Sequence, residues 1–221
     1  MITGVREVSG KKLKLKLKKR NPVEARLKRE RIKDNLLFFA HFLISPAKLG
    51  TPLPTTREIG EAIAEELKKI KATKVIELGA GLGSITGQIL EVLDGKGKLL
   101  CIEKSPIFCK HLKEKFGDKI IIIEEDALAI DNLIKNTEWE KTDALVCSIP
   151  MANEAALELS KKMADVLYPD GLLLQVTNYD SAIRKYFNIE RSIKFKNNIP
   201  PEKLHIAYPK KESEKKELHN E

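Results

Sequence analysis

The sequence predicts an α/β protein built on a mostly parallel sheet of seven strands, with helices on both faces and an antiparallel hairpin at the C-terminal edge. The apolar run 75–78 leads directly into Gly79, Gly81 and Gly83 and then into a helical pattern. Short β-branched runs then alternate with helical segments, which is typical of doubly wound parallel sheets. Only the loop 197–203 separates the last two strand patterns, so a crossover helix cannot fit and a hairpin is expected.

Size and composition favour one domain with an N-terminal appendage. The chain has 221 residues, of which 42% are hydrophobic, enough to bury one core. No apolar run approaches the ~18 residues that span a bilayer, and the N-terminus lacks the apolar region of a secretory signal. The three cysteines form no CxxC pair and the four histidines are scattered. We therefore expect free thiols in the cytoplasm and no metal site.

The positive charge is concentrated at the N-terminus. Residues 1–34 hold 13 Lys/Arg and four Asp/Glu, a net charge of +9, whereas the remaining residues hold 27 basic and 28 acidic side chains. Such asymmetry indicates a polyanionic partner, either nucleic acid or an anionic membrane surface.

The N-terminal part is expected to contain an arm, a helix and a loop. Leucines alternate with lysines in residues 11–20, which is strand-like or disordered rather than helical. Asn21 can cap a helix that runs to about Ile44, where Ser45 and Pro46 end it. Residues 50–56 then form a loop, and Thr55 or Thr56 can cap a helix through Lys69.

Strands and helices alternate beyond this point. We expect strands near 98–103, 119–124, 144–149, 172–177, 189–196 and 204–208, and helices near 84–93, 106–116, 152–167 and 181–187. Residues 210–221 are mostly charged and read as a frayed tail. The domain boundaries are therefore 1–34 for the basic arm and the start of its helix, 35–209 for the folded domain, and 210–221 for the tail.

The glycine turn has a specific spacing. A dinucleotide fingerprint would require glycine at position 84 or 86, which are serine and threonine. The sequence instead resembles motif I of the class I S-adenosylmethionine-dependent methyltransferases, whose sheet is Rossmann-like. The resemblance implies S-adenosylmethionine as the cofactor. It also implies cofactor contacts by Glu77, Gly79, Ala80, Gly81 and Gly83.

Further cofactor contacts are expected where the next strands end, because ligands of open α/β sheets bind outside the carboxyl ends of the strands. Glu103 follows the glycine turn by ~20 residues, the spacing at which an acid binds the ribose diol; a solvated strand-end carboxylate is the alternative. Lys104, the residue after Glu103, is a further expected cofactor contact. Asp126 and Ala127 resemble the Asp-Ala that contacts adenine in these enzymes, with an ordinary polar loop as the alternative.

Residues 148–151, Ser-Ile-Pro-Met, close the fourth strand and bear on the substrate. Adenine N6 methyltransferases, including the ribosomal RNA dimethyladenosine transferases, carry Asn-Leu-Pro-Tyr or Asp-Pro-Pro-Tyr at this place. Their Asn or Asp accepts a hydrogen bond from the target amine, and their aromatic residue stacks on the flipped base. Ser148 instead resembles the serine of bacterial phospholipid N-methyltransferases, whose Ser-Gly-Leu-Pro is one residue longer. The stretch 175–179 is similar to their Gln-Phe-Thr-Tyr, and the resemblance covers about residues 36–208.

The resemblance implies N-methylation of phosphatidylethanolamine-type lipids by a peripheral enzyme at the inner face of the cell membrane. Ser148 is then a cofactor contact, and Phe39, Pro150, Met151 and Tyr179 are substrate contacts. His41 is a candidate base or a packed helix residue, and the ring of Tyr179 can face the methylated cation.

Two alternatives remain. The chain could methylate RNA adenine, with the basic arm binding phosphates, or it could be a non-catalytic cofactor-binding or nucleic-acid-binding protein on the same fold.

Overall fold

The computed structural model describes residues 57–135, 137–152, 154–196, 201–211, 213 and 214. The basic arm, the predicted helix up to Ile44 and the predicted site residues Phe39 and His41 lie outside the described residues. No helix within the described part of the chain is long and apolar enough to cross a membrane.

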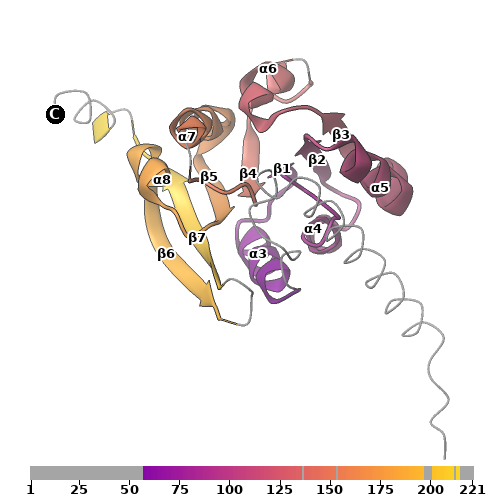
Figure 1. The fold of residues 1–221 in the computed structure, drawn as a ribbon, viewed down its shortest axis with the longest axis horizontal. Helices are drawn as coiled ribbons and strands as arrows, with labels where there is room; N and C mark the ends of the chain where they lie inside the picture. The colour runs from indigo at the N-terminus through magenta and orange to yellow at the C-terminus, as the bar shows by residue number, and fades with distance from the viewer. Residues whose placement is uncertain (1–56, 136, 153, 197–200, 212, 215–221) are drawn as a thin grey trace, which may run out of the picture.

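Helices and strands alternate along the described chain (Figure 1). The strands are β1 (Lys74–Leu78), β2 (Lys98–Glu103), β3 (Ile121–Glu124), β4 (Thr142–Cys147), β5 (Leu167–Val176), β6 (Phe187–Phe195) and β7 (Glu202–Pro209). The helices are α3 (Arg57–Lys69), α4 (Thr86–Leu93), α5 (Pro106–Phe116), α6 (Ile130–Lys135), α7 (Ala155–Val166) and α8 (Ser181–Tyr186), with short 3-10 helices η1 (Gly117–Lys119) and η2 (Ala127–Ala129).

All seven strands form one sheet in the order β3-β2-β1-β4-β5-β7-β6. The neighbours from β3 to β5 are parallel, whereas β7 is antiparallel to both β5 and β6. The edge strand β6 therefore runs in the direction of β5. This arrangement confirms the predicted mostly parallel sheet with a C-terminal hairpin. The C-terminal ends of β1 to β6 all lie at one edge of the sheet, the carboxyl edge, where β7 begins.

Each face of the sheet packs against its own group of helices. On one face, α3, α4 and α5 cover Val75, Val146 and Leu174. On the other, α6, α7 and α8 cover Ile76, Leu145 and Leu173. Neighbouring residues of one strand thus enter different cores, which explains why the central strands are apolar throughout rather than alternating.

Some elements differ from the expected ones. The helix α6 and the two 3-10 helices were not expected, because each has at most six residues and shows no sustained helical period. Strand β5 begins at Leu167 rather than near 172, because Leu167 pairs with Thr142 before the register shifts. Pro169 and Gly171 lie within this strand, and both residue types are typical of turns, which is why its first part was not expected.

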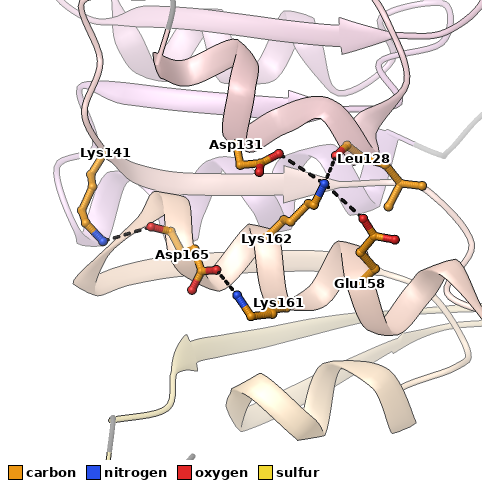
Figure 2. A network of polar contacts seen from close by, with 7 residues as sticks. All are labelled: Leu128, Asp131, Lys141, Glu158, Lys161, Lys162 and Asp165. Carbon is orange, nitrogen blue, oxygen red and sulfur yellow. Dashed lines mark hydrogen bonds and ion pairs between the residues drawn. The ribbon is translucent and has the colours of Figure 1, made fainter.

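Lys162 of α7 contacts the segment that follows β3 and holds it in place. Its ammonium donates to the carbonyl oxygen of Leu128 in η2 at 2.6 Å and forms ion pairs with Asp131 of α6 at 3.3 Å and Glu158 at 3.1 Å (Figure 2). Since η2 begins directly after Asp126, this network positions a predicted cofactor residue from the neighbouring helix.

Candidate functional site

The turn between β1 and α4 requires glycine for two different reasons. Gly79, Gly81 and Gly83 have φ values of +74°, +56° and +75°, a region that other residues rarely adopt. A Cβ on Gly79 would lie 2.9 Å from the side chain of Ile149, and one on Gly83 would lie 2.4 Å from Phe116 of α5. Among the described residues, a Cβ on Gly81 would meet no atom within 4 Å. The outer glycines therefore permit close packing, and Gly81 borders open space.

Glu103, the last residue of β2, connects this turn to α5. Its Oε2 accepts from the backbone N–H of Gly81 at 2.9 Å, and its Oε1 accepts from the N–H of Ser105 at 2.9 Å. The side chain is largely buried, and each carboxylate oxygen retains a further lone pair. The structure thus places a fixed acceptor beside Gly81, and the ribose contact stays a prediction.

Glu77 lies under the turn and faces α4. Thr86 donates its hydroxyl to Oε2 at 2.7 Å, and Cys101 Sγ lies 3.6 Å from the same oxygen. Among the described residues, Oε1 is buried without a hydrogen-bond partner. Burial raises the pKa of Glu77 to about 7, against which the Thr86 hydrogen bond acts. The carboxyl group therefore braces β1 against α4 in addition to its predicted role toward the cofactor.

The end of β3 brings Asp126, Ala127 and Lys104 together. Lys104 Nζ and Asp126 Oδ2 are 2.5 Å apart, and Asp126 Oδ1 accepts from the N–H of Leu128 at 3.0 Å. The Lys104 hydrogen bond lowers the pKa of Asp126, so this group is held as a carboxylate. Ala127 is buried at the start of η2. Glu103 and Glu124 are paired in register, which places Asp126 at the strand end next to Glu103.

The ends of β4 and β5 carry polar side chains that face the same region of the molecule. The N–H of Ser148 donates to the carbonyl oxygen of Leu78 at 3.1 Å, and the Nε2 of Gln175 donates to that of Ile149 at 3.1 Å. In the described part of the molecule, Ser148 Oγ and Gln175 Oε1 are buried and have no hydrogen-bond partner. Cys147 and Gln175 are paired in register, so both atoms belong to the same region of the carboxyl edge.

The predicted substrate residues differ in exposure. Met151 is 2% exposed and packs in the core with α7, so its side chain does not face an incoming substrate. Pro150 is half-buried, whereas Tyr179 is 56% exposed. Met151 therefore packs in the core, and the substrate contact of the exposed Tyr179 stays a prediction.

Sequence reasoning missed the role of His205. This buried residue of β7 lies 2.7 Å from Ser192 Oγ through Nδ1 and 3.1 Å from the carbonyl oxygen of Thr177 through Nε2. Burial lowers its pKa, so the imidazole is neutral, and the Thr177 carbonyl requires the proton on Nε2. His205 thereby holds the loop that presents Tyr179. Only the fold reveals this, because an isolated histidine has no motif around it.

These residues fit S-adenosylmethionine. Gly81, Glu103 and Asp126 follow or end the neighbouring strands β1, β2 and β3. This is the order in which the methionine part, the ribose and the adenine of the cofactor would lie. In the described chain, no group of three metal-ligating side chains accompanies them. The arrangement suits the positioning of a methyl donor beside an acceptor at the ends of β4 and β5.

The sequence profile of the ribosomal RNA adenine dimethylase family matches residues 53–168, more than half of the chain. The ornithine lipid N-methyltransferase of Singulisphaera acidiphila is 24% identical over 191 residues, which cover 82% of this chain and all of that enzyme. A probable ribosomal RNA small subunit methyltransferase A of Haloarcula marismortui is 34% identical over 67 residues, 28% of this chain and 22% of that enzyme.

Among solved structures, an O-methyltransferase of Bacillus cereus in complex with SAH is similar over 82% of this chain and 91% of its own, with a TM-score of 0.64 and 13% identity. This likeness shows that the sheet and its helices have the arrangement found in methyltransferases.

Proposed function

The chain belongs to the ribosomal RNA adenine dimethylase family of S-adenosylmethionine-dependent methyltransferases, and we propose that it N-methylates the amine headgroup of phosphatidylethanolamine-type phospholipids. One observation carries the choice of substrate. The end of β4 offers Ser148 and a buried Met151 where a base-flipping enzyme needs an amide or carboxylate and a ring to stack on the base. A primary amine requires no such platform.

The lipid amine is also consistent with other features of the site. Ser148 Oγ and Gln175 Oε1 are unpartnered acceptors in the described chain, and an amine has hydrogens to donate to them. The exposed ring of Tyr179 could stabilise the methylated cation by about 0.5–2 kcal/mol. The ornithine lipid N-methyltransferase, which this chain matches over that enzyme's full length, supports a lipid amine as the acceptor class.

In the proposed reaction, S-adenosylmethionine supplies an electrophilic methyl group, and the chain supplies alignment. Glu103 and the glycine turn fix the donor side, and the ends of β4 and β5 orient an uncharged amine in line with it. Such alignment can account for ~7–11 kcal/mol of the barrier. The ammonium group would lose a proton to solvent before attack. As the N–C bond formed, the methyl C–S bond would break and S-adenosylhomocysteine would leave. We place this reaction at the inner face of the cell membrane, where an amine headgroup is within reach of a peripheral enzyme.

RNA adenine methylation is the second candidate, favoured by the family profile and by the relative from Haloarcula. The non-catalytic alternative is not retained, because the chain is a methyltransferase.

Transfer of a labelled methyl group separates the two candidates. Purified full-length protein would be given labelled S-adenosylmethionine with either phosphatidylethanolamine vesicles or ribosomal RNA. The proposal expects label in the lipid fraction and none in RNA above a reaction without enzyme. Label in adenosine, with none in lipid, would refute the lipid proposal and favour RNA.

A further inference from the structure

The end of β6 and the start of β7 lie at the same edge of the sheet as the candidate site. Strand β6 runs in the direction of β5. Phe195, the last residue of β6, and Glu202, the first residue of β7, therefore lie at the carboxyl edge. The side chain of Asn178, directly before the exposed Tyr179, donates from Nδ2 to the carbonyl oxygen of Pro201 at 2.8 Å. The loop after β5 and the hairpin therefore form one continuous rim beside the proposed acceptor position.

Two lysines face each other across this hairpin. Lys194 of β6 and Lys203 of β7 are paired in register. They lie on the face that carries Ser192 and His205, because residues two positions apart in a strand share a face. Like charges directly opposite each other destabilise a hairpin. Within the described ranges neither ammonium has an ion pair, and Lys203 contributes to lowering the pKa of His205.

The charge along the carboxyl edge is unevenly distributed. The exposed acids Glu124 and Glu125 lie at the β3 end of the sheet, whereas the exposed Lys196 follows β6 at the opposite end (Figure 1). Glu202 is the acid beside Lys203 in β7, so the described end of the hairpin holds three lysines against one acid. Asp180, which follows Tyr179, is paired with Arg184 at 2.8 Å. An anionic partner that approaches this edge is therefore attracted to the hairpin and repelled from β3.

We propose that Lys194 and Lys203 bind the headgroup phosphates of an anionic membrane and thereby seat the carboxyl edge of the sheet on the lipid surface. This inference rests on the proposed lipid substrate. It assigns the lysine pair its missing counter-charge, and it places Tyr179, a residue type enriched at membrane–water interfaces, at the same rim. The lipid amine then reaches the ends of β4 and β5 without leaving the membrane surface.

The test compares Lys194→Gln/Lys203→Gln with a matched double variant, Lys68→Gln/Lys113→Gln. Lys68 and Lys113 are exposed and, in the described chain, have no ion pair, but they lie near the ends of α3 and α5, toward the opposite edge of the sheet. Full-length proteins would be sedimented with vesicles of phosphatidylethanolamine and phosphatidylglycerol over a range of salt concentrations. Binding of S-adenosylhomocysteine serves as the measure of correct folding.

We expect the hairpin variant to lose vesicle affinity by about 30-fold, with a shallower salt dependence, since two lysines are removed from the anionic surface. The control variant should bind as the native protein does. Equal vesicle binding by both variants would overturn the inference. Loss of RNA binding by the hairpin variant, with vesicle binding intact, would also overturn it and assign the lysines to RNA.

A second measurement separates this inference from the proposed function. The hairpin substitutions should lower methylation of dispersed short-chain phosphatidylethanolamine far less than methylation of vesicle lipid, because the many phosphates of the anionic surface are absent from dispersed lipid. If the native protein methylates no lipid in either form, the proposed function fails. If both proteins methylate dispersed lipid but bind vesicles equally, only the role of the lysine pair fails.

Discussion

The Oε2 of Glu103 accepts a hydrogen bond from the backbone N–H of Gly81 at 2.9 Å. This contact joins the end of β2 to the turn after β1, and the Ser105 N–H at the other carboxylate oxygen joins it to the start of α5. One side chain thus fixes the relative positions of the two strand ends that the methionine part and ribose would contact.

We expect Glu103→Gln to weaken binding of S-adenosylhomocysteine by about 10- to 100-fold, because an amide has one acceptor oxygen and no charge. Glu124→Gln is the matched control, since Glu124 is paired with Glu103 in register and is exposed. Calorimetric titration of both variants gives the comparison. Equal affinities would show that Glu103 does not contact the cofactor.

Gly81→Val should abolish cofactor binding while the protein remains folded. The added side chain enters space that none of the described residues occupies, so the direct cost to folding is the left-handed backbone, about 1–2 kcal/mol. Gly95→Val has the same cost, since Gly95 has φ +69° and an equally open Cβ position, but it lies in the turn between α4 and β2. Thermal unfolding and cofactor titration of both variants would test this. Loss of binding in Gly95→Val as well would indicate a general effect on the fold.

Glu77 predicts a specific pH dependence of stability. Its pKa is raised from 4.5 to about 7 by burial, so the folded state holds a proton that the unfolded state releases. The contribution of Glu77 is therefore fully present below the unfolded pKa and is lost as pH rises through about 7. Relative to Glu77→Gln, the free energy of unfolding of the native protein should fall by about 3 kcal/mol between about pH 4 and about pH 8. Urea unfolding across this range measures it, and parallel curves would contradict the assignment.

Tyr179 should affect the substrate and not the cofactor. Tyr179→Leu removes the ring and is expected to lower kcat/KM for lipid by about 2- to 30-fold, whereas Tyr179→Phe keeps the ring and most of the activity. Affinity for S-adenosylhomocysteine should be unchanged in both, because Tyr179 lies beyond β5. Equal activity of the two variants would show that the Tyr179 ring does not contribute to the acceptor site.

The sheet and the cofactor turn were predictable because their signals are local. The glycines at 79, 81 and 83, the acid at the end of β2 and the β-branched runs each follow from short-range sequence patterns, and the structure confirms the sheet that they imply. Short elements such as α6 were not predictable, since they are stabilised by the Lys162 network and by the core rather than by their own sequence.

The acceptor side was less predictable because it depends on which residues face one another. Met151 follows Pro150 in a motif position, yet its side chain turns into the core beside α7. His205 and the Lys194–Lys203 pair become meaningful only through the antiparallel pairing of β7 with its neighbours. Sequence distance gives no indication of these contacts.

The central claim is that the methyl acceptor is a lipid amine, and mass spectrometry of the lipid product tests it most directly. Full-length protein would be incubated with isotopically labelled S-adenosylmethionine and phosphatidylethanolamine vesicles, with Gly81→Val as the inactive control. The account predicts labelled methyl groups on the headgroup nitrogen in the native reaction and none in the control. An unmodified headgroup, together with labelled methyladenosine when ribosomal RNA is supplied instead, would contradict it.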